Sequence, residues 1–155
     1  MAAHMITTNL FSFFLVFMAI SSAFKAQENK QCEYEMIVST GPTRGPTYKL
    51  GLVLEAVGGK NINTTNMVKH WGDMGLKHTY FLPNSTDRFR TRLPCMVANF
   101  CWIGIKGKKG ELNPHWFINS VTVSTKGDGI NRFKTFLTNT DVDFIYPYVS
   151  DGECP

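Results

Sequence analysis

Four cysteines have the clearest chemistry in this sequence: Cys32, Cys95, Cys101 and Cys154. An even number of cysteines in an oxidising compartment is normally paired in disulfides. A zinc site would need two close pairs of Cys or His, whereas Cys95 and Cys101 have five residues between them and the other two lie far away. Proximity in the sequence favours the pairs Cys95–Cys101 and Cys32–Cys154, although four cysteines admit three connectivities.

The remaining reactive side chains form no known catalytic motif. The sequence contains no Gly-x-Ser-x-Gly nucleophile turn, no His-Glu-x-x-His metal motif and no glycine-rich phosphate loop. His70, His78 and His115 are dispersed, and no Ser or Cys is clearly partnered with them. We therefore predict that the protein is not an enzyme, and a hydrolase with an unrecognised site is the remote alternative.

Two short runs of basic residues suggest contact with an anionic surface. Three arginines in the first run alternate with other residues, so in a strand their guanidinium groups would share one exposed face. Each basic residue near an anionic membrane contributes about 1 kcal/mol to binding. The alternative is a solvated edge strand that is protected from aggregation by its charge. The candidate residues are Arg88, Arg90, Arg92, Lys106, Lys108 and Lys109.

Residues 1–26 are predicted to be a secretory signal peptide. The apolar run Leu10–Ile20 carries no charge and is shorter than the roughly 20 residues that span a bilayer. Small residues follow it, as at a cleavage site, with cleavage expected after Ala23 or Ala26. We expect entry into the secretory pathway, to the endoplasmic reticulum or the extracellular space (the apoplast in a plant), with no transmembrane segment after cleavage.

The remainder of the chain, residues 27–155, has the length of a single domain with a real core. Two sequons, at Asn63 and Asn84, predict N-glycosylation in the secretory pathway. The formal net charge of +4 is modest, and neither a long basic tail nor a strongly basic helix is present. Nucleic-acid binding is therefore not expected.

Alternation of apolar and polar residues predicts short, half-buried strands. Because one-sided sheets bury their apolar faces only against each other, we expect an all-β fold, an antiparallel β-sandwich of two roughly four-stranded sheets. In one strand, Phe117, Val121 and Val123 would face the core beside Asn119, whose amide would need internal partners. Strands are expected over residues 33–39, 48–56, 64–69, 78–82, 87–93, 98–106, 117–125, 131–137 and 144–149.

Several motifs in a fixed order connect the chain to a known family. The most specific is His115-Trp116-Phe117-Ile118-Asn119-Ser120-Val121-Thr122-Val123. Through these motifs the chain resembles the plant stress-associated group of the PLAT domain family, named for polycystin, lipoxygenase and alpha-toxin. The others are Cys32-Glu33-Tyr34, Thr40-Gly41, Trp71-Gly72-Asp73-Met74-Gly75, Tyr80-Phe81, Asp87 with Phe89, Pro94-Cys95 with Cys101, Phe133, Phe136-Leu137 and Cys154.

The resemblance implies a β-sandwich that docks onto membranes or protein partners. In lipoxygenases and lipases such a domain accompanies a catalytic domain, for which this chain has no room. We therefore expect a stand-alone binding module that recognises a lipid or membrane surface, a hydrophobic ligand or a protein partner in a plant stress or developmental response. The main alternative is a protein-binding inhibitor or signalling ligand that uses the loop Thr40–Thr47.

The resemblance also bears on calcium and on Trp71. Some PLAT relatives bind calcium through an acidic residue at the start of the second strand, where this sequence has Tyr48. A hard cation prefers several charged oxygen ligands, so we expect no family-type calcium site and no cofactor. Asp73, Asp87 and Asp128 are interpreted as ordinary turn residues. Trp71 is a candidate membrane-dipping side chain, but the favoured interpretation is a lid over the core.

Overall fold

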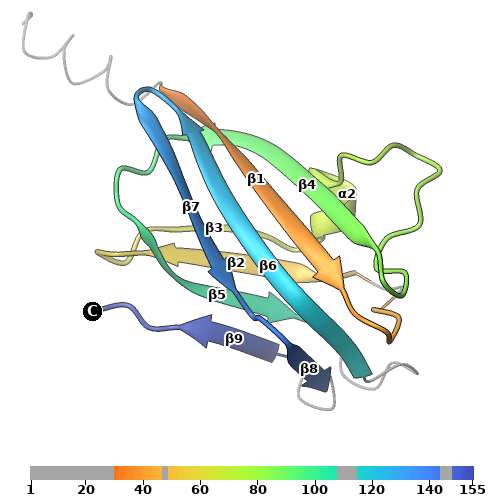
Figure 1. The fold of residues 1–155 in the computed structure, drawn as a ribbon. Helices are drawn as coiled ribbons and strands as arrows, with labels where there is room; N and C mark the ends of the chain where they lie inside the picture. Colours follow the sequence, from red (N-terminus) through yellow and green to blue (C-terminus); the bar gives the residue numbers. More distant parts are fainter. Residues whose placement is uncertain (1–29, 47–48, 108–114, 144–147) are drawn as a thin grey trace, which may run out of the picture.

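The protein is a β-sandwich closed at one end by a short helix (Figure 1). The computed structural model describes residues 30–46, 49–107, 115–143 and 148–155. Two antiparallel sheets of five and four strands face each other, which confirms the predicted fold class. The first sheet has the order β4 (Thr86–Pro94), β1 (Gln31–Thr40), β6 (His115–Gly127) and β7 (Ile130–Phe136), with β8 (Thr140–Asp143) also paired to β6. The second has the order β3 (Asn61–Thr64), β2 (Gly51–Ala56), β5 (Phe100–Lys106) and β9 (Tyr148–Gly152).

The core consists of the side chains that alternate inward from both sheets. In β1, Tyr34, Met36 and Val38 are buried and the residues between them are not. Strands β2 and β5 show the same period of two. This pattern places apolar side chains between the sheets and leaves the two outer faces to polar residues.

Two segments predicted as strands take other structures. In residues 64–69, a helix forms instead, α2 (Met67–Trp71), because the Asn66 side chain caps it by accepting the Lys69 N–H at 3.1 Å. Residues 78–82 form a loop in which Phe81 has a φ of +59°. In the last predicted segment, residues 144–147 lie outside the described part of the chain.

Because of a bulge in β6, Phe117 does not lie on the core face that was predicted for it. In the register with β1, Ser39 pairs with Ser120 but Thr40 pairs with Ile118, so Asn119 is an extra residue. The bulge reverses the alternation, and therefore the buried side chains of this region are those of Trp116, Ile118, Val121 and Val123, while Phe117 is only half-buried. Asn119 Nδ2 lies 3.5 Å from Ser39 Oγ and 3.5 Å from Thr40 O, so its amide has partners at the end of β1.

The two disulfides correct the pairing suggested by sequence proximity. They join Cys32 to Cys95 and Cys101 to Cys154. Strand pairing explains the first, because Cys32 lies opposite Leu93 in the β1–β4 register and Cys95 follows two residues later. The second arises in the same way, since Trp102 lies opposite Gly152. With separations of 63 and 53 residues, each bond contributes about 4 kcal/mol in the chain-entropy model.

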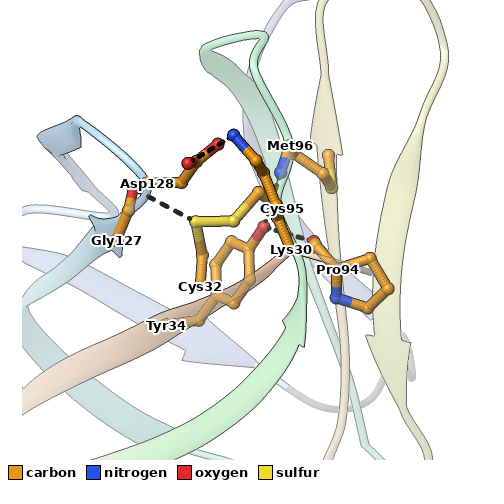
Figure 2. Close-up of a disulfide and its surroundings, with 8 residues drawn as sticks. All are labelled: Lys30, Cys32, Tyr34, Pro94, Cys95, Met96, Gly127 and Asp128. Atoms are coloured by element: carbon orange, nitrogen blue, oxygen red, sulfur yellow. Dashed lines mark hydrogen bonds and ion pairs between the residues drawn. A yellow bond between two sulfur atoms is a disulfide. The ribbon is translucent and has the colours of Figure 1, made fainter. Parts of the chain in front are cut away.

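Figure 2 shows how the Cys32–Cys95 bond is embedded at the end of the sandwich opposite α2. The Tyr34 hydroxyl donates to Pro94 O at 2.9 Å and accepts the Met96 N–H at 2.9 Å. Burial raises the pKa of Tyr34 above its usual value. An ion pair of 2.7 Å between Lys30 and Asp128 lies beside the bond. A disulfide, two hydrogen bonds of Tyr34 and an ion pair therefore stabilise this end of the sandwich.

Candidate functional site

The end that carries α2 is built from loops held together by backbone hydrogen bonds. The β1–β2 connection begins at Gly41, and residues 72–85 run from α2 to β4. Gly45 N–H donates to Phe81 O at 2.8 Å, and Asn84 N–H donates to Gly41 O at 2.7 Å. A side chain at Gly45 would lie 2.5 Å from Phe81 Cβ. The two loops therefore form one packed unit.

The buried carboxylate of Asp87 holds the loop of residues 72–85 in place through hydrogen bonds. Asp87 is fully buried at the start of β4. It accepts the Phe81 N–H at 2.7 Å and hydrogen-bonds His78 Nε2 at 2.6 Å. The Phe81 ring then packs against Phe89 and Trp116, with centroids 5.7 Å and 4.9 Å away. The interpretation of Asp87 as a turn residue is therefore wrong, because Asp87 lies in β4 and shares its buried face with Phe89.

A groove of about 420 Å³ is lined in part by His78 and Phe81, the two residues that Asp87 holds. Three cationic side chains line it: Arg44 and Lys49 from the β1–β2 connection, and Lys69 from α2. His78 and Tyr80 also line it, and none of its lining residues is acidic. Among the residues that the structure describes, no carboxylate forms an ion pair with Arg44, Lys49 or Lys69. This groove was not predicted from the sequence, because the packing of the chain, and not a local pattern, brings Lys69 to the same groove as Arg44 and Lys49.

Apolar side chains project from the same loop that borders the groove. Leu76 is fully exposed, and Met74 and Leu82 are 38% and 37% exposed. Trp71, in contrast, is only 7% exposed and belongs to the core cluster. Trp71 is therefore a lid on the core, as favoured, and the membrane-dipping assignment is wrong.

The three arginines of β4 lie on the outer face of the first sheet, where carboxylates of β1 face them. Glu33 lies opposite Arg92, and Glu35 lies opposite Arg90. Arg90 Nη2 donates to Glu35 Oε2 at 3.0 Å, and this bond, with Glu33 nearby, raises the pKa of Arg90 above its usual value. Arg92 Nη2 lies 4.0 Å from Glu33 Oε2.

The third arginine is also paired, since Arg88 Nε donates to Asp73 Oδ2 at 2.9 Å. We call the group Arg88, Arg90 and Arg92 the arginine ladder. Lys106 is exposed on the outer face of the opposite sheet, so the sandwich separates it from the ladder. Lys108 and Lys109 lie outside the described residues. The described residues of the predicted basic patch therefore do not form one continuous surface.

A second hollow of about 550 Å³ lies between β7 and the start of β5. Its cations are held by neutral acceptors, with Arg132 Nη1 donating to Asn99 Oδ1 at 2.7 Å and Lys134 Nζ donating to Cys101 O at 3.4 Å. Lys134 Nζ also lies 4.6 Å from the centre of the Phe136 ring. Inward-pointing charges on an edge strand such as β7 are a known protection against strand addition.

The predicted glycosylation sites Asn63 and Asn84 are both exposed. Across the described ranges, no group of three or more His, Cys, Asp or Glu side chains is placed to hold a metal ion. Tyr48, on which the calcium prediction rests, lies outside those ranges, as does the predicted signal peptide. In the same ranges, no helix has the length and apolar character needed to cross a bilayer.

The amino-acid sequence is similar to those of two plant proteins. No protein-family model matches the chain. PLAT domain-containing protein 1 of Arabidopsis thaliana is 24% identical over 120 residues, which cover 76% of this chain and 66% of that protein. PLAT domain-containing protein 2 of the same plant is 25% identical over 118 residues, which cover 75% of this chain and 64% of that protein. In sequence, the chain therefore resembles PLAT domain-containing proteins.

The fold of this chain also occurs in a coral 8R-lipoxygenase that is activated by calcium through a C2-like domain. The two superpose with a TM-score of 0.55 at 17% identity, over 79% of this chain and 18% of the lipoxygenase. The match spans slightly less than two thirds of either plant relative.

Proposed function

We propose that this chain is a non-catalytic PLAT module that docks on a lipid membrane through the end that carries α2. The proposal rests on one observation: the exposed side chains of Met74, Leu76 and Leu82 extend from the loop that also borders a groove whose cations have no ion-pair partner among the described residues. Apolar side chains gain free energy on leaving water for the acyl boundary, and nearby cations are attracted to anionic lipids.

The biological setting is also part of this proposal. Two disulfides and two exposed sequons, at Asn63 and Asn84, support passage through the secretory pathway as a glycoprotein. A role in a plant stress or developmental response is part of the proposal, and both relatives come from a plant. Because Tyr48 stands at the position of the acidic calcium ligand of some relatives, docking is proposed to be independent of calcium.

Co-sedimentation with anionic vesicles tests the docking surface. Leu76→Asp should weaken binding at least tenfold, because burial of a Leu side chain is worth about 1.5–3 kcal/mol. Val97→Asp is the matched control, because Val97 is also strongly exposed, at 75%, but follows Cys95 at the disulfide end. Binding of the wild type should be equal in calcium and in chelator.

Equal loss in the two variants, or no vesicle binding by the wild type, would overturn membrane docking. In the second case, capture of a defined protein partner by the wild type would favour the inhibitor or signalling-ligand alternative.

A further inference from the structure

The groove lined by Arg44, Lys49 and Lys69, called the basic groove below, supports a more specific inference about the ligand. This inference rests on the proposed membrane docking. We propose that the basic groove binds the phosphomonoester headgroup of an anionic phospholipid, such as phosphatidic acid. Arg44, Lys49 and Lys69 supply the positive charge, and the exposed apolar side chains of the adjoining loop keep the groove at the membrane surface.

The first argument is that the groove cations have no carboxylate partner among the described residues. Elsewhere on the molecule, Lys30, Arg88, Arg90 and Arg92 are all in ion pairs with carboxylates. The three groove cations come from the β1–β2 connection and from α2, and they form no ion pair with any carboxylate in the described part of the chain. Like charges brought together in this way repel one another, and an anion that enters the groove relieves the repulsion.

The second argument is that the backbone beneath two of these cations is fixed. Arg44 is flanked by Thr43, whose Oγ1 accepts the Phe117 N–H at 2.6 Å, and by Gly45, whose N–H donates to Phe81 O at 2.8 Å. Lys69 lies in α2, and its own N–H is held by the Asn66 cap. Fixed attachment points reduce the entropy lost when the flexible ends of these side chains close on a ligand.

The third argument concerns the shape and polarity of the groove. Its volume of about 420 Å³ is within the range of small-molecule sites. Polar groups such as those of Thr79, Asn66 and His78 line it together with the cations. His78 is held from below by the buried Asp87 carboxylate at 2.6 Å. These polar groups suit a headgroup, and Pro46, Val68, Tyr80 and Phe81 complete the lining.

The fourth argument selects the class of headgroup. A phosphomonoester carries a charge of about −1.5 to −2 and three strong acceptor oxygens, and the Arg44 guanidinium can donate to it through two parallel N–H groups. A diester phosphate carries a single negative charge. Three convergent cations therefore favour phosphatidic acid over phosphatidylserine when the two membranes have equal surface charge.

Vesicle binding at matched surface charge tests the inference. The wild type should bind phosphatidylcholine vesicles containing phosphatidic acid at least tenfold more tightly than vesicles containing phosphatidylserine. The triple variant Arg44→Gln/Lys49→Gln/Lys69→Gln should lose this preference. The matched control, Arg88→Gln/Arg90→Gln/Arg92→Gln, changes the net charge equally on the outer face of the first sheet and should keep it. Unfolding curves confirm that both variants are folded.

The outcomes separate this inference from membrane docking itself. Binding to both vesicles without preference, still sensitive to Leu76→Asp, would overturn the headgroup site and leave docking intact. Equal losses in the two triple variants would also overturn the site, because net charge alone would then explain binding. No binding to any vesicle would overturn docking. A titration with glycerol 3-phosphate separates the two sources of phosphate, since affinity equal to that for vesicles would overturn the lipid assignment in favour of a soluble ligand.

Discussion

The arginine ladder and the basic groove are both rich in cations but differ in what faces those cations. In the ladder, Glu33 and Glu35 lie across the strand pair from Arg92 and Arg90, and Asp73 holds Arg88. In the groove, the lining residues include no acid. The comparison shows that positive charge close together in the sequence does not by itself mark a binding surface, because a neighbouring strand supplies the neutralising groups.

The two regions also differ in how they are built. The ladder follows from strand alternation and antiparallel register alone. The groove depends on irregular backbone, including the positive φ of Phe81, and on the Asp87 carboxylate beneath it. We therefore expect substitutions under the groove to have larger effects than substitutions in the ladder.

The largest effect is expected from Asp87→Asn. The amide has one acceptor oxygen in place of two and no charge, so it cannot accept from both the Phe81 N–H and the His78 ring, and no bond to it is assisted by a carboxylate charge. Loss of charge-assisted hydrogen bonds at a buried site should lower the free energy of unfolding by about 2 kcal/mol, measured by urea denaturation. Headgroup preference should fall as well, because the loop that lines the groove loses its support.

Asp128→Asn is the control for this prediction. Asp128 is partly exposed and pairs with Lys30 at the other end of the sandwich, so its replacement should change stability by less than about 1 kcal/mol. If the two variants unfold alike, Asp87 does not support the groove and the contrast between the two regions is lost.

The sequence predicts the regular part of the molecule better than the site. Alternation identified the buried faces of β1 and β2, because a period of two depends only on local positions. It failed where one extra residue, Asn119, reversed the alternation, and where the Asn66 cap began a helix. The cysteine pairing failed because strand neighbours, and not sequence neighbours, bring Cys32 to Cys95.

The site was harder to predict for the same physical reason. Arg44, Lys49 and Lys69 are brought together by the packing of two loops against α2, and no local pattern records that packing. The arginines of the ladder gave a strong local signal, but their partners Glu33 and Glu35 are more than fifty residues away in the sequence. The motif of Asp87 and Phe89 was visible, yet its role became clear only with the contacts of Phe81.

A smaller effect is expected from removing the carboxylates that face the ladder. In Glu33→Gln/Glu35→Gln, Arg90 and Arg92 lose ion-pair partners and become available to an anionic membrane. Binding to anionic vesicles should rise several-fold, without a preference for phosphatidic acid, because the ladder lies on a flat sheet face and not in a groove. Co-sedimentation with the two kinds of vesicle measures both quantities.

The control for the ladder is Glu55→Gln/Glu153→Gln, which changes the net charge equally at positions away from β4. A gain of equal size in this variant would mean that total charge, and not the exposure of the arginines, controls binding. A new preference for phosphatidic acid in Glu33→Gln/Glu35→Gln would show that unpaired cations alone suffice, and the shape of the groove would then explain nothing.

The smallest effect is expected at Asp73, which connects the ladder to the loop bordering the groove. Its ion pair with Arg88 spans 2.9 Å, but the two side chains are 34% and 45% exposed, so water and salt screen the attraction. Asp73→Asn should lower the free energy of unfolding by less than about 1 kcal/mol in low salt and by less still in high salt. Because Asp73 N–H also donates to Arg88 O at 3.1 Å, the backbone link survives the substitution. Headgroup preference should therefore remain unchanged, and a loss of preference in Asp73→Asn would mean that the two regions act as one surface.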